Sequence, residues 1–375
     1  MSEVLVYAFL RKNFGDDLMV SILCRRYPHI TFCVWADADY RAIYRDIENV
    51  KICTENGKLA RMWDRFCGKF RIENQYFFQR LVRKTGTVVQ IGGSIYMQQD
   101  GYMNNYYLES MMQLESRSMY LCGANFGPYR DEAYYQQYHE LLGKYSGICF
   151  RDRYSYRLFQ DLANARYAAD TVFSYQDPPD YLPVQEKKQV LISVMQLRER
   201  ALLAEQYAED YQRFLVKTAE CYLEKGYQVK FISLCGEQGD GVAIREIETK
   251  IFAEKQELLS EYFYTGNLRE CVRVFDESEI VIGTRLHSII LGWLRKKKVL
   301  PIVYDEKTQH ILDDNQRNIF VRLDQLKDAD IEELTTKIER MPQEQLEHNI
   351  ESANEQFKDL DQQFKAGGDY TCKSR

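Results

Sequence analysis

The sequence predicts an α/β protein with two domains, each built on a mostly parallel sheet, that face a common cleft. The chain has 375 residues, more than the roughly 100–200 residues of one ordinary domain. Short apolar runs alternate with helical patterns along most of its length, and strands separated by helices form parallel sheets covered on both faces. A proline-rich segment interrupts this alternation near the middle.

In the first half, five apolar runs have the length and composition of buried strands. They are Val4–Leu10, Thr31–Trp35, Thr87–Ile91, Met119–Gly123 and Gly147–Arg151. Helical periodicity predicts helices over Asp17–Tyr27, Arg61–Arg83, Tyr107–Met119 and Glu132–Lys144.

The second half repeats the pattern. Its predicted strands are Val190–Val194, Gln228–Leu234, Glu279–Ile282 and Val299–Tyr304. Its predicted helices are Ala204–Lys225, Asp240–Glu254, Asn267–Asp276 and Leu286–Arg295. The charged tail from Asp330 onward is also helical, and it either forms a solvated amphipathic cap or crosses back to the first domain.

The domain boundary is predicted at the segment Tyr175–Pro183, which holds three of the seven prolines. Proline fixes φ and has no N–H, so this segment cannot continue a helix or a central strand. We therefore expect domains over 1–175 and 189–375, joined by a linker over 176–188.

Composition excludes several classes of protein. The net charge of −6 and the lack of a long basic tract argue against a nucleic-acid-binding role. The N-terminus lacks the pattern of a signal peptide, and no run of about 18 apolar residues predicts a transmembrane helix. The ten cysteines are scattered without a CxxC pair, which fits a cytoplasmic protein and predicts no metal site.

The strongest candidate site is the stretch Gly283–Ser288, where an apolar strand ends and a helix begins. Amides at a helix N-terminus bind anions, and Arg285 adds donors that match a carboxylate or a phosphate. His287 can bind an oxyanion or transfer a proton near neutral pH. The alternative is structural: Arg285 caps a carbonyl and His287 packs in the first helical turn.

A second candidate is the turn after the first strand, which contains Asn13, Gly15, Asp16 and Asp17. Gly15 allows a tight turn or a close approach of ligand. The functional interpretation is a carboxylate that accepts a proton from a sugar hydroxyl. The structural one is that Asp16 or Asp17 caps the next helix.

Three further strands of the first half end in turns of similar design. One turn is Gly92, Gly93 and Ser94, the next contains Asn125, and the third starts at Arg151 and Asp152. Because the carboxyl ends of parallel strands meet at one edge, these turns predict a single lined crevice. Arg151 and Asp152 are otherwise a structural ion pair.

Two other patterns are less specific. The basic run Arg295–Lys298 is interpreted as the solvated end of a helix, or else as a contact with an anionic membrane surface. The stretch Gly236–Gly241 comes too late, and has the wrong glycine spacing, for a dinucleotide-binding loop. It is interpreted as a turn before a helix, and a dehydrogenase is not expected.

Taken in order, these segments resemble the polysaccharide pyruvyl transferase family over roughly positions 4–310. The matching residues are Asn13, Gly15 and Asp16; Gly92 and Gly93; Gly123, Gly127 and Pro128; Arg151, Asp152 and Ser155; Ala169, Asp170 and Phe173; Gly283, Arg285 and His287; and Tyr304, Asp305 and Lys307. The chain departs from the pattern at Ser94, where a third glycine or an acid is expected.

The resemblance implies a GT-B-like fold of two Rossmann-like domains, with the acceptor on the first domain and the donor on the second. It implies phosphoenolpyruvate as a co-substrate, with no further cofactor, and a free or lipid-linked saccharide as acceptor. The enzyme would act in the cytoplasm, including the inner face of the membrane, on precursors of capsules, exopolysaccharides or cell-wall polymers.

The resemblance also suggests roles for the candidate residues. His287 is the expected acid or phosphate ligand, and Asp16 the expected base. The expected donor-binding residues are Arg285, Leu286, Ser288, Lys307 and Arg151. The expected acceptor or cleft residues are Asn13, Gly15, Asp17, Gly92, Gly93, Ser94, Asn125 and Asp152. The rival functions are a glycosyltransferase that uses a nucleotide sugar and a non-catalytic glycan-binding protein.

Overall fold

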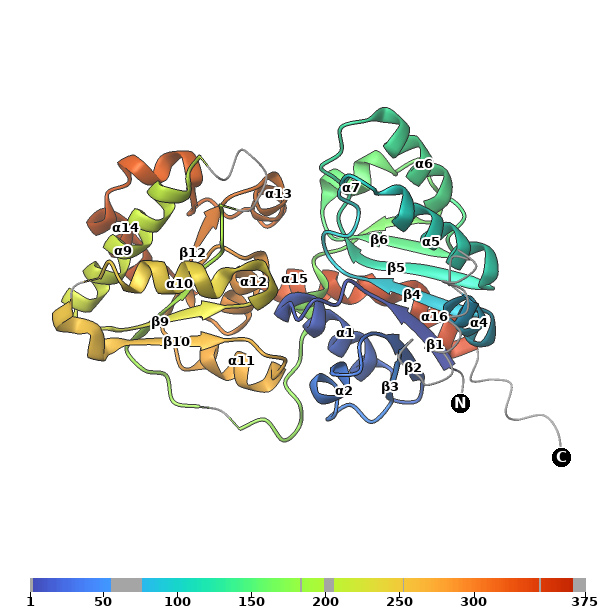
Figure 1. The fold of residues 1–375 in the computed structure, drawn as a ribbon, viewed down its shortest axis with the longest axis horizontal. Coiled ribbons are helices and arrows are strands. Elements are labelled where there is room, and N and C mark those ends of the chain that lie inside the picture. The colour runs from blue at the N-terminus through green and yellow to red at the C-terminus, as the bar shows by residue number, and fades with distance from the viewer. Residues whose placement is uncertain are drawn as a thin grey trace, which may run out of the picture. The chain divides into compact units, whose positions relative to one another are not determined.

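The computed structural model describes residues 3–54, 76–182, 184–198, 206–251, 253–343 and 345–366. The chain divides into two compact units (Figure 1). Unit 1 contains the chain up to Leu10, the segment Leu18–Ser174 and the chain from Ile350 on, whereas unit 2 contains Arg11–Asp17 and Tyr175–Asn349. The expected boundaries need correction at two places, because the turn at 11–17 belongs to unit 2 and the tail belongs to unit 1.

Unit 1 is built on a seven-stranded sheet of order β3-β2-β1-β4-β5-β6-β7, with all neighbours parallel. The strands are β1 (Glu3–Tyr7), β2 (Thr31–Trp35), β3 (Val50–Cys53), β4 (Thr87–Ile91), β5 (Ser118–Ala124), β6 (Gly147–Phe150) and β7 (Ala165–Tyr167). The central strands are buried on both faces, as their continuous apolar runs require.

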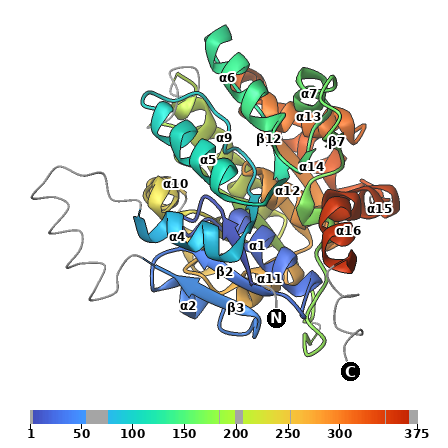
Figure 2. The same cartoon turned by 90° about the vertical axis from the view of Figure 1, so that its right-hand side faces the viewer.

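Helices cover both faces of this sheet. They are α1 (Phe14–Arg26), α2 (Tyr40–Ile43), α4 (Tyr76–Thr85), α5 (Met103–Glu115), α6 (Glu132–Leu142), α7 (Arg153–Leu158), α15 (Glu347–Asn354) and α16 (Lys358–Ala366). Figures 1 and 2 show α4, α5 and α6 in a row, and α5 packs between the other two. Helix α1 starts in unit 2 and continues into unit 1.

The C-terminal tail docks through one buried glutamine. The side chain of Gln356 accepts a hydrogen bond from the N–H of Gly123 at 2.8 Å and donates to the carbonyls of Phe150, Ala168 and Ala169. The amide thus satisfies backbone groups near the ends of β5, β6 and β7. Of the tail predicted from Asp330 onward, the part from Ile350 on belongs to the first unit, whereas the part up to Asn349, with α14 (Ile331–Glu339), belongs to unit 2.

Unit 2 has a six-stranded sheet of order β10-β9-β8-β11-β12-β13, again with all neighbours parallel. The strands are β8 (Gln189–Ser193), β9 (Gln228–Ser233), β10 (Leu259–Phe263), β11 (Ile280–Gly283), β12 (Lys298–Val303) and β13 (Val321–Arg322). The helices are α9 (Ala208–Glu224), α10 (Asp240–Glu248), α11 (Leu268–Asp276), α12 (Leu286–Leu294), α13 (Glu306–Asp314) and α14 (Ile331–Glu339).

The predicted fold class is confirmed: both units are Rossmann-like, with parallel sheets and alternating helices. All nine predicted strands are present within a few residues of their expected bounds. The four strands that were missed, β3, β7, β10 and β13, are the edge strands of the two sheets. They are short and partly exposed, so they lack the apolar run that marks a central strand.

The helix predictions need several corrections. Helix α1 begins at Phe14, earlier than the predicted Asp17, and α10 ends at Glu248. The predicted helix Arg61–Arg83 is seen only as α4, and its part before residue 76 lies outside the described residues. Helix α5 lies earlier than the predicted Tyr107–Met119, and helices α2, α7 and α13 were not predicted.

Candidate functional site

The candidate donor residues lie at the switch point of the unit 2 sheet. Strands β8 and β11 are neighbours, and the chain order runs outward in opposite directions from them. In open α/β sheets, ligands bind outside the carboxyl ends of the strands at this point. Strand β11 ends at Gly283, where a Cβ would lie 2.7 Å from a side-chain carbon of Ile289. Glycine therefore lets α12 start close to the strand.

Arg285 precedes α12 and is nearly buried, with 8% of its surface exposed. Its Nε and Nη2 each donate to Asp240 at 2.6 Å, and its Nη1 donates to Gln238 at 3.0 Å. Burial lowers the pKa of Arg285, but the carboxylate of Asp240 outweighs this effect and the net shift is upward. The guanidinium forms a bidentate ion pair rather than a carbonyl cap.

Asp240 was not predicted as a site residue. It starts α10 after a turn in which Gly239 has φ +80, and it is fully buried. The stretch Gly236–Gly241 is thus a turn before a helix, as expected, but it also supplies the partner of Arg285. An acid directly after a glycine turn, at the expected end of a strand, is the signal that the sequence offered.

His287 lies in the first turn of α12 and packs against the N-terminal turn of the chain. A Cβ on Gly15 would lie 1.6 Å from Nδ1 of His287. This turn is held to the end of β9, because the N–H of Phe14 donates to the carbonyl of Leu234 at 3.0 Å and Asn13 forms a bridge with Cys235. The structure therefore brings Gly15 and His287 together within unit 2.

The two acids of this turn do not cap α1. The helix begins before them, and the cap position is taken by Asn13, whose Oδ1 accepts from the N–H of Gly15 at 3.1 Å. Asp16 and Asp17 lie in the first helical turn, where carboxylates complement the helix dipole. Asp17 is fully buried and accepts from the hydroxyl of Tyr264 at 2.8 Å, which indicates a structural role.

Asp16 is 7% exposed and lies close enough to the thiol of Cys235 to affect it. Burial raises the pKa of Cys235, and the charges of Asp240 and Asp16 act in the same direction, whereas Arg285 opposes them. The charge of Asp16 therefore acts on the same thiol as the charges of Arg285 and Asp240.

Lys307 belongs to the next strand end, where β12 leads into α13. Asp305 caps α13 by accepting from the N–H of Thr308 at 2.9 Å, and Nζ of Lys307 lies 3.2 Å from the Asp305 carboxylate. Burial raises the pKa of Asp305, but Lys307 and the hydrogen bonds from Thr308 have the larger, opposite effect. The net shift of the Asp305 pKa is downward. Lys307 and His287 thus follow adjacent strands at one edge of the sheet.

The remaining donor candidates on α12 differ from each other. The hydroxyl of Ser288 donates to the carbonyl of Arg285 at 2.6 Å and is fully buried, so it stabilises the helix start. Leu286 is partly exposed, and its amide lies in the first turn, where helix geometry provides no acceptor within the helix.

Arg151 lies in unit 1, and its guanidinium is 3% exposed. It donates to Asp170 at 3.0 Å and to Asn125 at 2.6 Å, and a Cβ on Gly93 would lie 2.4 Å from its Nη1. Ser94 completes the cluster with hydrogen bonds to Asn125 and Arg151. The turns after β4, β5 and β6 do converge, but around a buried arginine.

The expected ion pair between Arg151 and Asp152 is not formed, because Arg151 pairs with Asp170 instead. Asp152 caps α7 by accepting from the N–H of Ser155 at 2.7 Å. Both residues therefore have structural partners in unit 1.

The basic run at 295–298 is largely neutralised. Arg295 pairs with Asp177 and Asp276, Lys297 with Glu186, and Lys298 with Glu279. These pairs favour the structural interpretation over contact with an anionic membrane. Within the described residues, no helix is long and apolar enough to cross a membrane, and no group of three or more His, Cys, Asp or Glu residues could hold a metal ion.

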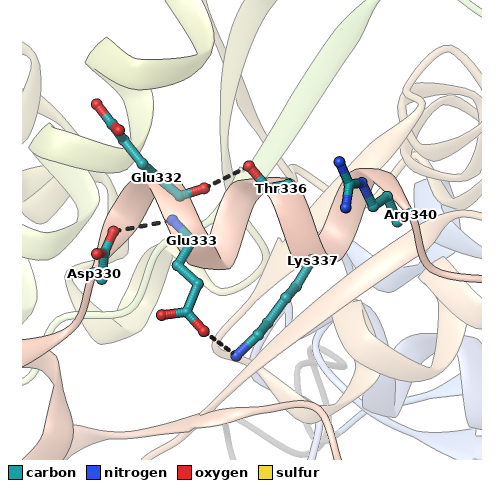
Figure 3. Close-up of a pocket in the computed structure, with 6 residues that line it drawn as sticks. All are labelled: Asp330, Glu332, Glu333, Thr336, Lys337 and Arg340. Carbon is teal, nitrogen blue, oxygen red and sulfur yellow. Dashed lines mark hydrogen bonds and ion pairs between the residues drawn. The ribbon is translucent and has the colours of Figure 1, made fainter.

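One pocket lies on the surface of α14 (Figure 3). It is lined by Asp330, Glu332, Glu333, Thr336, Lys337 and Arg340, all from the helix or its two ends. Lys337 pairs with Glu333 along the helix. None of these residues is a candidate site residue, and they lie on a largely exposed helix face.

Comparison with known proteins decides the family. The family model described as polysaccharide pyruvyl transferase matches residues 13–306, which include both the Asn13 turn and the Arg285–His287 segment. The chain belongs to the polysaccharide pyruvyl transferase family. The resemblance seen in the motifs is confirmed.

Solved structures with similar folds are distant in sequence. The UDP-GlcNAc 2-epimerase of Methanocaldococcus jannaschii, in complex with UDP-GlcNAc and UDP, has 8% identity and a TM-score of 0.59, with 96% of this chain and 99% of that chain covered. A putative UDP-N-acetylglucosamine 2-epimerase from Listeria monocytogenes has 9% identity and a TM-score of 0.58, with 97% of each chain covered. A glycosyltransferase from Rickettsia africae has 8% identity and a TM-score of 0.53, with 99% of each chain covered. These matches support the GT-B-like fold.

Proposed function

We propose that this member of the family transfers the enolpyruvyl group of phosphoenolpyruvate to two hydroxyls of a saccharide, forming a pyruvate ketal and releasing phosphate. The observation that carries the proposal is the contact between His287 and Gly15. It joins the Gly-x-Arg-x-His motif to the Asn-x-Gly-Asp motif at one edge of the unit 2 sheet. A saccharide precursor at the cytoplasmic face of the membrane, free or lipid-linked, is the proposed acceptor.

The reaction needs an acid, a base and a site for a multiply charged anion. Protonation of the vinyl carbon leaves positive charge on the central carbon, which the first sugar hydroxyl attacks with loss of its proton. The second hydroxyl forms the other C–O bond as the C–O bond to phosphate breaks, and its proton leaves with the phosphate. Positioned acids and bases each contribute typically about 10²–10⁴-fold to such steps.

The residues of unit 2 fit these tasks. His287 is the proposed acid, or the ligand of the departing phosphate, because it lies in the first turn of α12 and its imidazole packs against Gly15 of the N-terminal turn. Lys307 supplies a cation at the next strand end. Asp16 is the proposed base, since it is the acid of the N-terminal turn that retains some exposure. Arg151 is not assigned to the donor, because its guanidinium is occupied in unit 1.

The test is an assay with phosphoenolpyruvate and purified saccharide acceptors. We expect phosphate release that depends on the acceptor, together with a new methyl signal of the ketal in the proton NMR spectrum. His287→Ala should abolish both signals. His139→Ala is the matched control, since His139 lies on α6 in unit 1 and pairs with Asp161.

The rival functions give different outcomes in the same assay. Consumption of a nucleotide sugar in place of phosphoenolpyruvate would identify a glycosyltransferase. Tight binding of phosphoenolpyruvate without turnover on any glycan would identify a binding protein. Full activity of the His287→Ala enzyme would remove the proposed role of the imidazole.

A further inference from the structure

The glycine-rich turn at 236–241 has no role in the proposed mechanism, yet it provides the main partner of Arg285. Asp240 is 0% exposed and its carboxylate holds the guanidinium through two parallel hydrogen bonds of 2.6 Å. A bidentate pair of this kind fixes the plane and the direction of the guanidinium, not only its charge.

We infer that Asp240 is a positioning residue of the donor site: it orients Arg285 and neutralises much of its charge, so that Arg285 recognises the donor through directed N–H groups. This inference rests on the proposed function. A guanidinium has five N–H donors. Asp240 takes two and Gln238 takes one, so two remain for a ligand.

The carboxylate of Asp240 is itself held in place. Its Oδ1 also accepts from the backbone N–H of Gln196, at 3.3 Å, in the loop after β8. Asp240 thus links the chain after β8, the start of α10 after β9, and the residue after β11. These are three adjacent strands at the switch point. A carboxylate with three partners cannot swing to follow a mobile arginine.

The residue before Arg285 is anchored in the same way. The hydroxyl of Thr284 lies 2.9 Å from that of Tyr211, which accepts from the N–H of Met195 at 3.1 Å. All three residues are fully or almost fully buried. The backbone that carries Arg285 is therefore rigid, and its side chain is fixed at the far end by Asp240. Pre-organisation of this kind is what a site for a small anion requires.

Neutralisation has a chemical consequence. Because Asp240 cancels charge next to Arg285, the charge of phosphoenolpyruvate must be balanced by other groups. The first-turn amides of α12 lie at the same sheet edge, whereas Lys307 is itself paired with Asp305. Arg285 then contributes direction, which suits the planar carboxylate of the donor better than its phosphate.

The alternative is that the Asp240–Arg285 pair only stabilises the fold by connecting two loops. A double-mutant cycle separates this structural role from the positioning role. The variants are Asp240→Asn, Arg285→Gln and the double variant, with kcat and KM for phosphoenolpyruvate, and the thermal midpoint, as readouts. We expect Asp240→Asn to lower kcat/KM on the order of 10- to 100-fold, mainly through KM, as misplacement of a binding group does.

The double variant shows whether Asp240 positions Arg285 or only stabilises the fold. Removing both charges should restore the thermal midpoint, because no unpaired charge stays buried. If Asp240 positions Arg285, kcat/KM of the double variant stays as low as that of Arg285→Gln alone, since no guanidinium is left to orient. Recovery of kcat/KM together with stability would overturn the inference. If Arg285→Gln does not fold, Arg285→Lys, which keeps the charge and loses the fork, replaces it in the cycle, and the expectation for kcat/KM is the same because no guanidinium is left to orient.

A matched control exists in the same unit. Arg295 donates from Nε and Nη2 to the carboxylate of Asp276, which ends α11 ahead of β11. Asp276→Asn should lower the thermal midpoint and leave kcat/KM for phosphoenolpyruvate unchanged. An equal loss of kcat/KM in both aspartate variants would also overturn the inference.

The inference and the proposed function fail in different ways. If calorimetry shows no binding of phosphoenolpyruvate by the wild-type protein, the proposed function fails. If the wild type binds and Asp240→Asn binds equally well, only the role of Asp240 is lost.

Discussion

The imidazole of His287 occupies the space in which a side chain on residue 15 would begin. A Cβ on Gly15 would lie 1.6 Å from Nδ1 of His287, far inside van der Waals contact. Gly15 lies in the first turn of α1, so its backbone conformation alone does not require glycine. The absence of a side chain at this position lets two distant motifs meet.

Gly15→Ala should therefore displace His287. We expect pyruvyl transfer to fall on the order of 10²-fold, because a shift of about 1 Å in a catalytic group has that effect. Alanine favours the helix, but the clash with the imidazole opposes this gain, so the thermal midpoint should not rise. Initial rates of phosphate release, with circular dichroism for folding, provide the measurement.

Gly236→Ala is the control for this substitution. It lies in the same unit, and a Cβ there meets no atom within 4 Å. It should leave the rate unchanged. Wild-type activity in Gly15→Ala would show that pyruvyl transfer does not depend on the observed position of the His287 imidazole.

Asp170→Ala should destabilise unit 1, because it leaves the buried guanidinium of Arg151 without its charge partner. Breaking one side of a buried ion pair costs about 3–5 kcal/mol. Urea unfolding gives the free energy. The exposed pair of His139 and Asp161 supplies the control, and Asp161→Ala should cost less than about 1 kcal/mol. If Asp170→Ala were no less stable than Asp161→Ala, Arg151 would not be the structural centre described above.

Glu109 should make the stability of unit 1 depend on pH. Burial raises its pKa to about 7, while hydrogen bonds from Gln90 and Tyr138 partly oppose the shift. The folded state therefore holds a proton that the unfolded state releases, and stability is lost as pH rises from about 4.5 to about 7. The loss is on the order of 3 kcal/mol.

Glu109→Gln removes this titration while keeping the shape of the side chain. The difference in unfolding midpoint between the variant and the wild type should grow in favour of the variant as pH rises from about 4.5 to about 7. A difference that stays constant across this range would show that Glu109 is ionised throughout.

Cys53 should be the most reactive of the eight described cysteines. A hydrogen bond from Cys33 lowers its pKa to about 7 although burial acts in the opposite direction, and Cys53 is partly exposed. Cys24 and Cys122 are buried, and burial raises the pKa of both. Alkylation by iodoacetamide at neutral pH, followed by peptide mass spectrometry, should modify Cys53 first, since the thiolate is the nucleophile.

Cys33→Ala removes the hydrogen bond and tests its cause. The pH at which Cys53 is half-reactive should rise towards that of an ordinary thiol, about 8.5. An unchanged pH profile would assign the low pKa to the neighbouring lysines instead.

Much of the fold could be predicted because its central strands are buried on both faces. Such strands need continuous apolar runs, and these runs are visible in any local window of the sequence, as at Thr87–Ile91. The edge strands β3, β7, β10 and β13 have one open side and no such run, so their existence depends on a neighbour that is already in place.

The candidate site also has features that local sequence predicts and features that depend on tertiary contacts. Local sequence was sufficient to propose Arg285, His287 and Gly15 as candidates, because a glycine turn between a strand and a helix is a local pattern. Tertiary structure decided three contacts: Arg285 pairs with Asp240, His287 packs against Gly15, and Arg151 is buried beside Asp170. Each of these three pairs joins residues that are far apart in the sequence and meet only when the strands are assembled into sheets. Which partner a side chain finds therefore depends on the tertiary structure and not on its neighbours along the chain.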